Sequence, residues 1–284
     1  ENAITLVPSE QTILLRKLLN FGLIIRDHAL HLYVFVMPDI FGKDSILDFD
    51  ENNPREHKYL DDAFSVKAAG NWLSKRVGGR SVHAPFLTVG GFIKLPDIKE
   101  LQKSIKELED IRPKILDLIT LFAENPMSLE IKDIDFAAVT DKDYSFLYGD
   151  LVRTDEDVIA VEKYGEYLEH VTTPYSHASR YKFGGKVYMV GALARLNLMK
   201  DNLNSATKGD LGTIIDIFPS KNIFHNNLAQ AIEILHAVDS SLEILSDLEI
   251  TNEKPITPKR CAGVGIGVIE APRGTLYYKI EVDN

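Results

Sequence analysis

The chain has 284 residues, which is enough for one large domain or two ordinary ones. Its composition is 45% apolar and 26% charged, with 18 Gly and 12 Pro, which excludes disordered, collagen-like and small disulfide-rich classes. The formal net charge of -10 argues against non-specific binding to nucleic acid or to anionic lipid. We therefore expect a soluble globular protein with no nucleic-acid partner.

The chain contains one cysteine, Cys261. A single thiol cannot form an intramolecular disulfide, and it cannot supply any of the usual two- to four-cysteine metal sites. No histidine and acid pattern accompanies it, so we interpret Cys261 as a structural residue. The cysteine count predicts a reducing compartment and a cytoplasmic protein.

The sequence starts at Glu1, without Met and without a positively charged leader before an apolar run, which indicates a trimmed chain with no targeting segment. Residues 14–36 are the strongest membrane candidate, but they carry Arg26 and Asp27. A charge near the centre of a bilayer costs roughly 2.5–3.5 kcal/mol on insertion scales. We expect a buried helix in this segment, and no membrane partner.

The first half of the chain carries apolar residues at helical spacing. Residues 8–38 predict one long helix that ends near a Pro-Asp pair, and residues 57–77 predict a second helix that ends at Gly-Gly. Residues 82–95 are apolar but broken by Gly and Pro, which favours a short strand or an irregular connection. Residues 97–124 predict a long amphipathic helix, in which Pro113 is expected to produce a kink.

The second half mixes strands and helices. Residues 129–190 contain short apolar runs separated by Gly, Asp and Tyr, which predicts a small, mostly antiparallel sheet. Helical periodicity returns at residues 191–204, near 211–218, and strongly at 226–248. These helices are expected to flank the sheet.

The end of the chain predicts a hairpin. Gly263, Gly265 and Gly267 alternate with branched residues, so one face of this strand is expected to let another segment approach the backbone closely. The run is not a dinucleotide-binding loop, because no helix follows it and the G-x-G-x-x-G spacing is absent. Residues 272–274, Pro-Arg-Gly, lie between two extended runs and would present Arg273 at the apex. A guanidinium there suits an anionic ligand or a developing charge; an ordinary turn arginine is the alternative.

Together these elements predict an α+β fold that is mainly helical. We expect a core of long bundled helices, a small mostly antiparallel sheet and a C-terminal hairpin. The whole chain, 1–284, is expected to form a single domain, with residues 129–190 as a sheet-rich subregion within it.

Asp27, His28 and His31 stand out on an otherwise apolar helix. Asp27 and His31 are one turn apart, so they could form a proton-handling pair, or a satisfied polar pair inside a helical core. A buried carboxylate must be paired, by Arg26, a histidine or a distant Arg, or its pKa must rise. His28 and His31 could ligate a metal, but no further ligands follow at a recognisable spacing.

At these residues the sequence resembles the large, catalytic subunit of nickel-iron hydrogenases. Eight separated segments match in order, and the last is the most specific. They are residues 12–19, 27–33 (DHALHLY), 38–39 (PD), 83–85 (HAP), 89–92 (VGGF), 174–178 (PYSHA), 190–197 (VGALARLN) and 270–276 (EAPRGTL). The sequence of the second segment most resembles the cytosolic, multimeric branch of these hydrogenases, which exchanges electrons with nicotinamide, deazaflavin or sulfur carriers.

The resemblance implies a Ni-Fe centre in the parent enzyme, with electron-carrier subunits and an iron-sulfur small subunit as partners. In this family four cysteines in two Cys-x-x-Cys motifs hold the metals, and the chain contains neither motif. Glu1 would begin shortly after the first motif and Asn284 would stop before the second, which indicates a fragment. We therefore expect no metal ligand and no bound Ni-Fe centre in this chain, and no activity from the chain alone.

The resemblance also assigns site residues. Arg273 matches the family's arginine above the metal pair, Pro272 its apolar neighbour, and Asp27 a carboxylate of the same surroundings. Ala271 accompanies Pro272 beside the centre. A guanidinium is ordinarily protonated, so Arg273 would act as a base only through a transient neutral form, and Asp27 could hold it or pass the proton on. We expect Arg273 and Asp27 to converge on a common cavity.

Two other functions remain open from the sequence. The first is a metal-free electron-transport scaffold similar to the quinone-module subunit of respiratory complex I, which shares an Ala-Pro-Arg or Ala-Pro-Lys hairpin and lacks the cysteines. The second is a module that holds a small iron-sulfur subunit but has no chemistry of its own.

Overall fold

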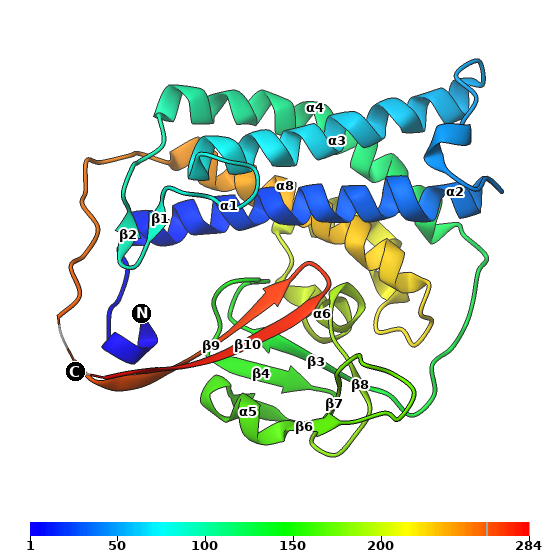
Figure 1. Cartoon of the computed structure of the whole chain (residues 1–284). Helices are drawn as coiled ribbons and strands as arrows, with labels where there is room; N and C mark the ends of the chain where they lie inside the picture. Colours follow the sequence, from blue (N-terminus) through cyan, green and yellow to red (C-terminus); the bar gives the residue numbers. More distant parts are fainter. Residues whose placement is uncertain (260, 284) are drawn as a thin grey trace.

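Four long helices pack against one another as a bundle, which forms the helical layer of the molecule (Figure 1). They are α1 (Glu10–Ala29), α3 (Pro54–Gly78), α4 (Ile98–Ala123) and α8 (His225–Asp247). The computed structural model describes residues 1–259 and 261–283. The four-stranded sheet and the C-terminal hairpin lie beneath the helical layer, so the predicted α+β, mainly helical class is confirmed.

The opening helix is confirmed, with an unexpected geometry near its end. Ser9 caps α1, because its side chain accepts a hydrogen bond from the Thr12 amide. The helical path continues through a π-helical segment, η2 (Leu30–Val36), into α2 (Met37–Ile40). It therefore ends two residues beyond the predicted stop at Pro38, which lies in the first turn of α2.

The buried face of α3 leaves out two of its largest side chains. Phe64 is 65% exposed and Trp72 is 46% exposed, whereas Gly70 and Leu73 are buried. The reason is the crossing of α1 over α3, where Gly22 and Gly70 bring the two backbones together and leave no room for a side chain. As predicted, α3 ends at a glycine pair, with Gly79 in the left-handed region at φ 88°.

The connection after α3 and the next helix follow the sequence. A short hairpin of two strands, β1 (Leu87–Thr88) and β2 (Gly91–Phe92), lies in the apolar stretch 82–95 that Gly and Pro interrupt. The helix α4 starts at its N-cap Asp97 and continues through Pro113.

The central sheet has four strands in the order β5-β4-β3-β8. They are β3 (Asp135–Thr140), β4 (Leu151–Thr154), β5 (Val158–Ala160) and β8 (Tyr188–Met189). The β3–β4 and β4–β5 pairs are antiparallel, and β3 pairs with β8 in parallel. A separate antiparallel pair, β6 (Leu168–Val171) and β7 (Arg180–Phe183), completes the sheet-rich region, which is mostly antiparallel as predicted.

The short helix α5 (Tyr164–Tyr167) lies between β5 and β6. The segments that join the sheet to α8 are α6 (Ala192–Met199), α7 (Ser205–Leu211) and short 3₁₀ segments that include η6 (Gly212–Ile217). The expected helices at 191–204 and 226–248 are confirmed, while most of the stretch near 211–218 is 3₁₀. The amide of Leu193 in α6 donates to the Asn226 side chain of α8 at 3.2 Å, which ties the two helices together.

The C-terminal hairpin consists of β9 (Gly263–Ala271) and β10 (Gly274–Val282), with its apex at residues 272–273. The close approach predicted for the glycine face is confirmed. A Cβ at Gly263 or Gly265 would overlap the backbone of Ala3, which lies in the short helix η1 (Asn2–Ile4). In Figure 1 the N-terminus accordingly lies near the open end of the hairpin, and the apex points toward the helical layer.

Two apolar clusters make up the core. The larger lies among the long helices, and the smaller lies between the central sheet, the β6–β7 pair and β9. Across the ranges 1–259 and 261–283, no helix is both long and apolar enough to cross a bilayer.

Candidate functional site

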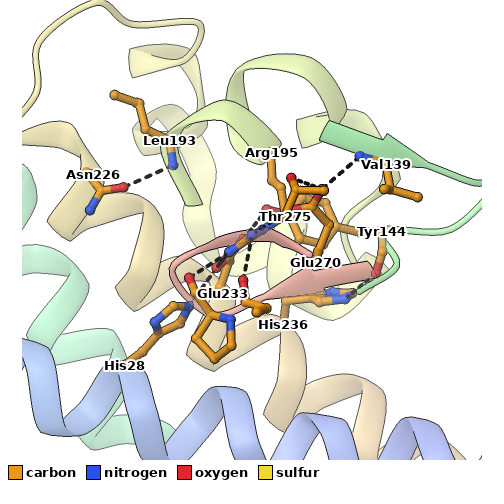
Figure 2. A network of polar contacts seen from close by, with 12 residues as sticks. His28, Val139, Tyr144, Leu193, Arg195, Asn226, Glu233, His236, Glu270 and Thr275 are labelled. Atoms are coloured by element: carbon orange, nitrogen blue, oxygen red, sulfur yellow. Dashed lines mark hydrogen bonds and ion pairs between the residues drawn. The ribbon is translucent and has the colours of Figure 1, made fainter. Parts of the chain in front are cut away.

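Arg195 on α6 has a fully buried side chain between α8 and the hairpin (Figure 2). Its Nε donates to Oε1 of Glu233 at 2.6 Å, and its Nη2 donates to Oε2 of the same carboxylate at 2.8 Å. Its Nη1 donates to Oε2 of Glu270 at 2.9 Å. A planar guanidinium has five N–H donors in a fixed fork, so it can bind several acceptors at once. Arg195 thereby links α8 to the end of β9.

The same guanidinium binds the backbone of the hairpin next to its apex. Nη1 donates to the Ala271 carbonyl and Nη2 to the Pro272 carbonyl, each at 3.1 Å. The other carboxylate oxygen of Glu270 accepts from the Val139 amide and from the Thr275 hydroxyl, each at 2.9 Å. Both strands of the hairpin are thus held where they meet β3 and α6.

The Glu233 carboxylate extends this network to the opening helix. Nε2 of His28 on α1 lies 2.7 Å from Oε2 of Glu233, and the Tyr144 hydroxyl donates to Oε1 at 2.6 Å. Phe146 covers the Arg195 guanidinium, whose carbon lies 5.2 Å from the ring centroid. We refer to His28, Tyr144, Arg195, Glu233 and Glu270 as the Arg195 network. All five residues are buried.

Burial and pairing set the charges in the Arg195 network. Burial opposes ionisation of Glu233, but Arg195 and His28 outweigh it and hold the pKa of Glu233 at about 2. Burial likewise opposes the charge on Arg195, yet the two carboxylates keep its pKa above the ordinary value. Burial lowers the pKa of His28, against the effect of Glu233, so His28 is neutral at pH 7. At pH 7 a buried guanidinium is therefore bound to a buried carboxylate.

Asp27 lies next to the Arg195 network without belonging to it. Its Oδ1 is 2.8 Å from Nε of Arg26, whose Nη1 also donates to the Ser81 carbonyl. Nδ1 of His31 lies 2.6 Å from the Gln230 side chain. Asp27 is therefore paired with Arg26, one of the partners expected from the sequence. Asp27 and His31, which are one turn apart, bind different groups and not each other.

Arg273 lies at the exposed apex of the hairpin, and its neighbour Pro272 is buried. Within residues 1–259 and 261–283, no hydrogen bond or ion pair holds the Arg273 guanidinium. The Arg195 network joins the turn of α1 that carries Asp27 to the hairpin apex that carries Arg273. Their catalytic roles, and the positions of Ala271 and Pro272 beside a metal centre, stay predictions.

A cavity of about 390 Å³ opens between α1, the loop after α3, and β9. Arg26 and His83 line it together with apolar side chains that include Ile269. Neither Asp27 nor Arg273 lines this cavity, so their convergence on a common cavity also stays a prediction.

The described residues do not fit the ligand set of a Ni-Fe centre. In the part of the chain that the structure describes, no three His, Cys, Asp or Glu side chains are grouped so that they could hold a metal ion. Cys261 is a half-buried free thiol just before β9. His28 and His31, considered as a metal pair from their spacing, bind Glu233 and Gln230 instead.

Sequence reasoning missed Tyr144 and Glu233 as site residues, and it gave no role to Arg195 and Glu270, which lie in matched segments. A signal was present for Glu233, because it is a carboxylate in the middle of a run of apolar residues in α8. Such a residue requires a buried cationic partner, but the spacing does not identify which one.

Comparisons of the sequence and of the fold with known proteins identify the family of this chain. The chain is 33% identical, over 291 residues, to the alpha subunit of sulfhydrogenase 1 from Pyrococcus furiosus, covering 100% of this chain and 67% of that protein. It superimposes with a TM-score of 0.83 on an NAD⁺-reducing NiFe-hydrogenase in the H2-reduced state, at 20% identity, covering 98% of this chain and 67% of the other. The chain belongs to the nickel-iron hydrogenase large-subunit family.

A further hydrogenase relative comes from the F420-non-reducing hydrogenase vhu of Methanocaldococcus jannaschii. It is 28% identical over 301 residues, covering 95% of this hydrogenase-family chain and 70% of that relative. The chain matches no protein-family profile. It spans about two thirds of the length of these hydrogenase relatives.

Proposed function

We propose that this chain forms the central part of the catalytic large subunit of a cytoplasmic hydrogenase, which oxidises or evolves dihydrogen. The 33% identity to the alpha subunit of a sulfhydrogenase, which extends over the whole chain, is the observation that carries the proposal. Electron-carrier subunits and an iron-sulfur small subunit are the partners that this function requires.

Arg273 and Asp27 are the residues that we assign to the reaction. The exposed guanidinium at the hairpin apex carries a permanent charge on a planar fork, which suits an anionic group or a charge that develops during reaction. Asp27, which is paired with Arg26, offers a carboxylate that can accept a proton or orient a cation. Pro272 and Ala271, whose carbonyls accept hydrogen bonds from Arg195, are the residues that we assign to the surroundings of the metal centre.

The isolated chain is expected to be inactive. Its one cysteine cannot replace four metal-binding cysteines, and its described residues do not fit the Ni-Fe ligand set. Its own contribution is the charged apex, the carboxylate on α1 and the buried network that joins them.

The test is hydrogen-dependent reduction of benzyl viologen, measured on the native complex purified through a tag on this chain, and on the chain alone. We expect turnover by the complex and none by the chain. Arg273→Lys keeps the charge but loses the fork, and should lower turnover on the order of 10²-fold. Arg153→Lys, at an exposed arginine of β4, is the matched control and should leave turnover unchanged. A native complex without hydrogen turnover, or one indifferent to Arg273→Lys, would contradict the proposal.

A second function, a metal-free electron-transport scaffold similar to the complex I quinone-module subunit, is favoured by one observation. The chain has a single cysteine. In that case the native complex would bind no nickel and would show no hydrogen turnover, which separates the two functions in the same experiment.

A further inference from the structure

Arg195 donates hydrogen bonds to the backbone next to the hairpin apex. Its side chain is 0% exposed, and its guanidinium makes five hydrogen bonds: two to Glu233, one to Glu270 and two to the Ala271 and Pro272 carbonyls. The two carbonyls directly precede Arg273 in the chain. No other side chain in the described part of the molecule donates to either of them.

The helix that carries Arg195 also touches the apex with its backbone. A Cβ at Gly191, the N-cap of α6, would lie 3.1 Å from the Arg273 carbonyl oxygen. On the other side, a Cβ at Gly274 would meet the Val190 side chain at 2.7 Å. The apex therefore rests on the start of α6, one turn before Arg195.

An isolated two-stranded hairpin is only marginally stable in water, so the position of its turn depends on contacts with the rest of the molecule. Among the described residues, β9 and β10 pair only with each other, so no neighbouring strand there holds the apex in place. The buried end of the hairpin nevertheless forms firm contacts, since the Glu270 amide donates to the Phe146 carbonyl at 2.7 Å. At the open end Gly263 and Gly265 of β9 contact η1, while Tyr278 and Ile280 of β10 are 58% and 56% exposed.

We propose that Arg195 is a positioning residue that fixes the hairpin apex, and with it the Arg273 guanidinium, relative to α1 and α8. Glu233 anchors Arg195 to α8 and, through His28, to the turn of α1 beside Asp27. The catalytic consequence of this arrangement rests on the proposed function. The position of the apex does not, so it can be measured without turnover.

The experiment measures the distance between spin labels on the 284-residue chain. Labels at Arg273→Cys and at the exposed position Lys106→Cys on α4, in a Cys261→Ser background, report the apex against the helical layer. Arg195→Lys keeps the positive charge but cannot bind both carboxylates and both carbonyls. We expect it to widen the distance distribution, while Arg153→Lys, at an exposed arginine that donates to the Leu198 carbonyl, leaves it narrow.

A residue that only stabilised the fold would lower the urea midpoint without widening the distribution of the folded chain. A folded Arg195→Lys chain with an unchanged distribution would therefore overturn the proposal. If Arg195→Lys does not fold, Glu270→Gln is the second variant, because it keeps the size of the side chain and removes one charged acceptor of Arg195. It should widen the distribution in the same way, and an unchanged one counts against the proposal.

Hydrogen exchange gives a second test, first on the unaltered chain and then on the folded variants. The Glu270 amide should exchange as slowly as amides in the middle of α8, and amides at the open end of the hairpin should exchange faster. In any folded variant that loses one charged hydrogen bond of the Arg195 network, exchange at Glu270 should be about tenfold faster or more. Rapid exchange of Glu270 in the unaltered chain would show that the apex is not held.

Discussion

His236 illustrates how the fold determines the charge of a single side chain. Its Nδ1 accepts from the Asn204 amide at 3.0 Å, and its Nε2 lies 3.1 Å from the Tyr144 carbonyl, which requires a proton on Nε2. Burial lowers the pKa of His236 to about 4, against that carbonyl and nearby carboxylates that include Glu233. The neutral tautomer satisfies both neighbours, and a second proton would break the bond to Asn204.

This pKa predicts a specific pH dependence of stability. The ordinary pKa of 6.5 applies in the unfolded chain, so the unfolded state binds more protons as the pH falls. The contribution of His236 to the free energy of unfolding should therefore be constant above pH 6.5. It should fall by about 3 kcal/mol as the pH drops toward 4. Urea unfolding at a series of pH values measures it.

Two histidine variants, a test variant and its matched control, check the origin of this pH dependence. His236→Gln should reduce the pH dependence of the free energy of unfolding between pH 6.5 and 4, because one of the buried titrating groups is gone. His177→Gln changes an exposed histidine and should leave the curve as it is. If both variants retain the full slope, the loss of stability has another origin.

Among the elements, the β9–β10 hairpin depends on its glycines for contact with η1. Gly265 faces Ala3, and the Asn2 side chain donates to the Ile266 carbonyl at 2.7 Å. Gly267, two residues further on the same face, has no atom within 4 Å of the place where a Cβ would lie. Two glycines on one face of one strand therefore have different surroundings.

Gly265→Ala should destabilise the protein by about 1–3 kcal/mol, because the new methyl group must displace the backbone of η1. Gly267→Ala is the matched control and should be neutral or slightly stabilising, since alanine restricts the unfolded chain. Urea unfolding midpoints of the two variants provide the comparison. Equal midpoints would mean that η1 does not press on the hairpin in solution.

On the scale of the whole molecule, β3 connects the two apolar clusters. Phe136 and Ala138 pack in the helical cluster, whereas Ala137 and Val139 pack in the sheet cluster. A strand that is buried on both faces couples the two layers, because neither can open without exposing it. The Arg195 network adds a second connection between the helices and the hairpin.

The prediction of a single domain over 1–284 can be tested through this coupling. Val152→Ala, a truncation inside the sheet cluster, should cost about 2 kcal/mol. It should lower by the same amount the urea midpoints reported by Trp72 fluorescence on α3 and by hydrogen exchange in β3 and β4. Val158→Ala, at a side chain that is 57% exposed, is the control. A Val152→Ala shift in the strands alone would indicate two independent domains.

Local patterns were sufficient for much of the fold. The extents of α1, α3, α4 and α8, the sheet-rich stretch and the hairpin follow from periodicity, caps and turn residues, all of which act within a few positions. The π-helical segment η2, the exposure of Trp72 and the parallel β3–β8 pair did not follow, because neighbours from other elements decide them.

For the site, the sequence by itself determined which side chains stand out: Asp27 and His28 on an apolar helix, and Arg273 at a Pro-Arg-Gly turn. Only the tertiary structure decided their partners. His28 meets Glu233, which lies 205 positions away, and Arg195 reaches from α6 to carbonyls of the hairpin. A buried charge must find a partner of opposite sign, and the packing of the elements, not the spacing of residues along the chain, selects that partner.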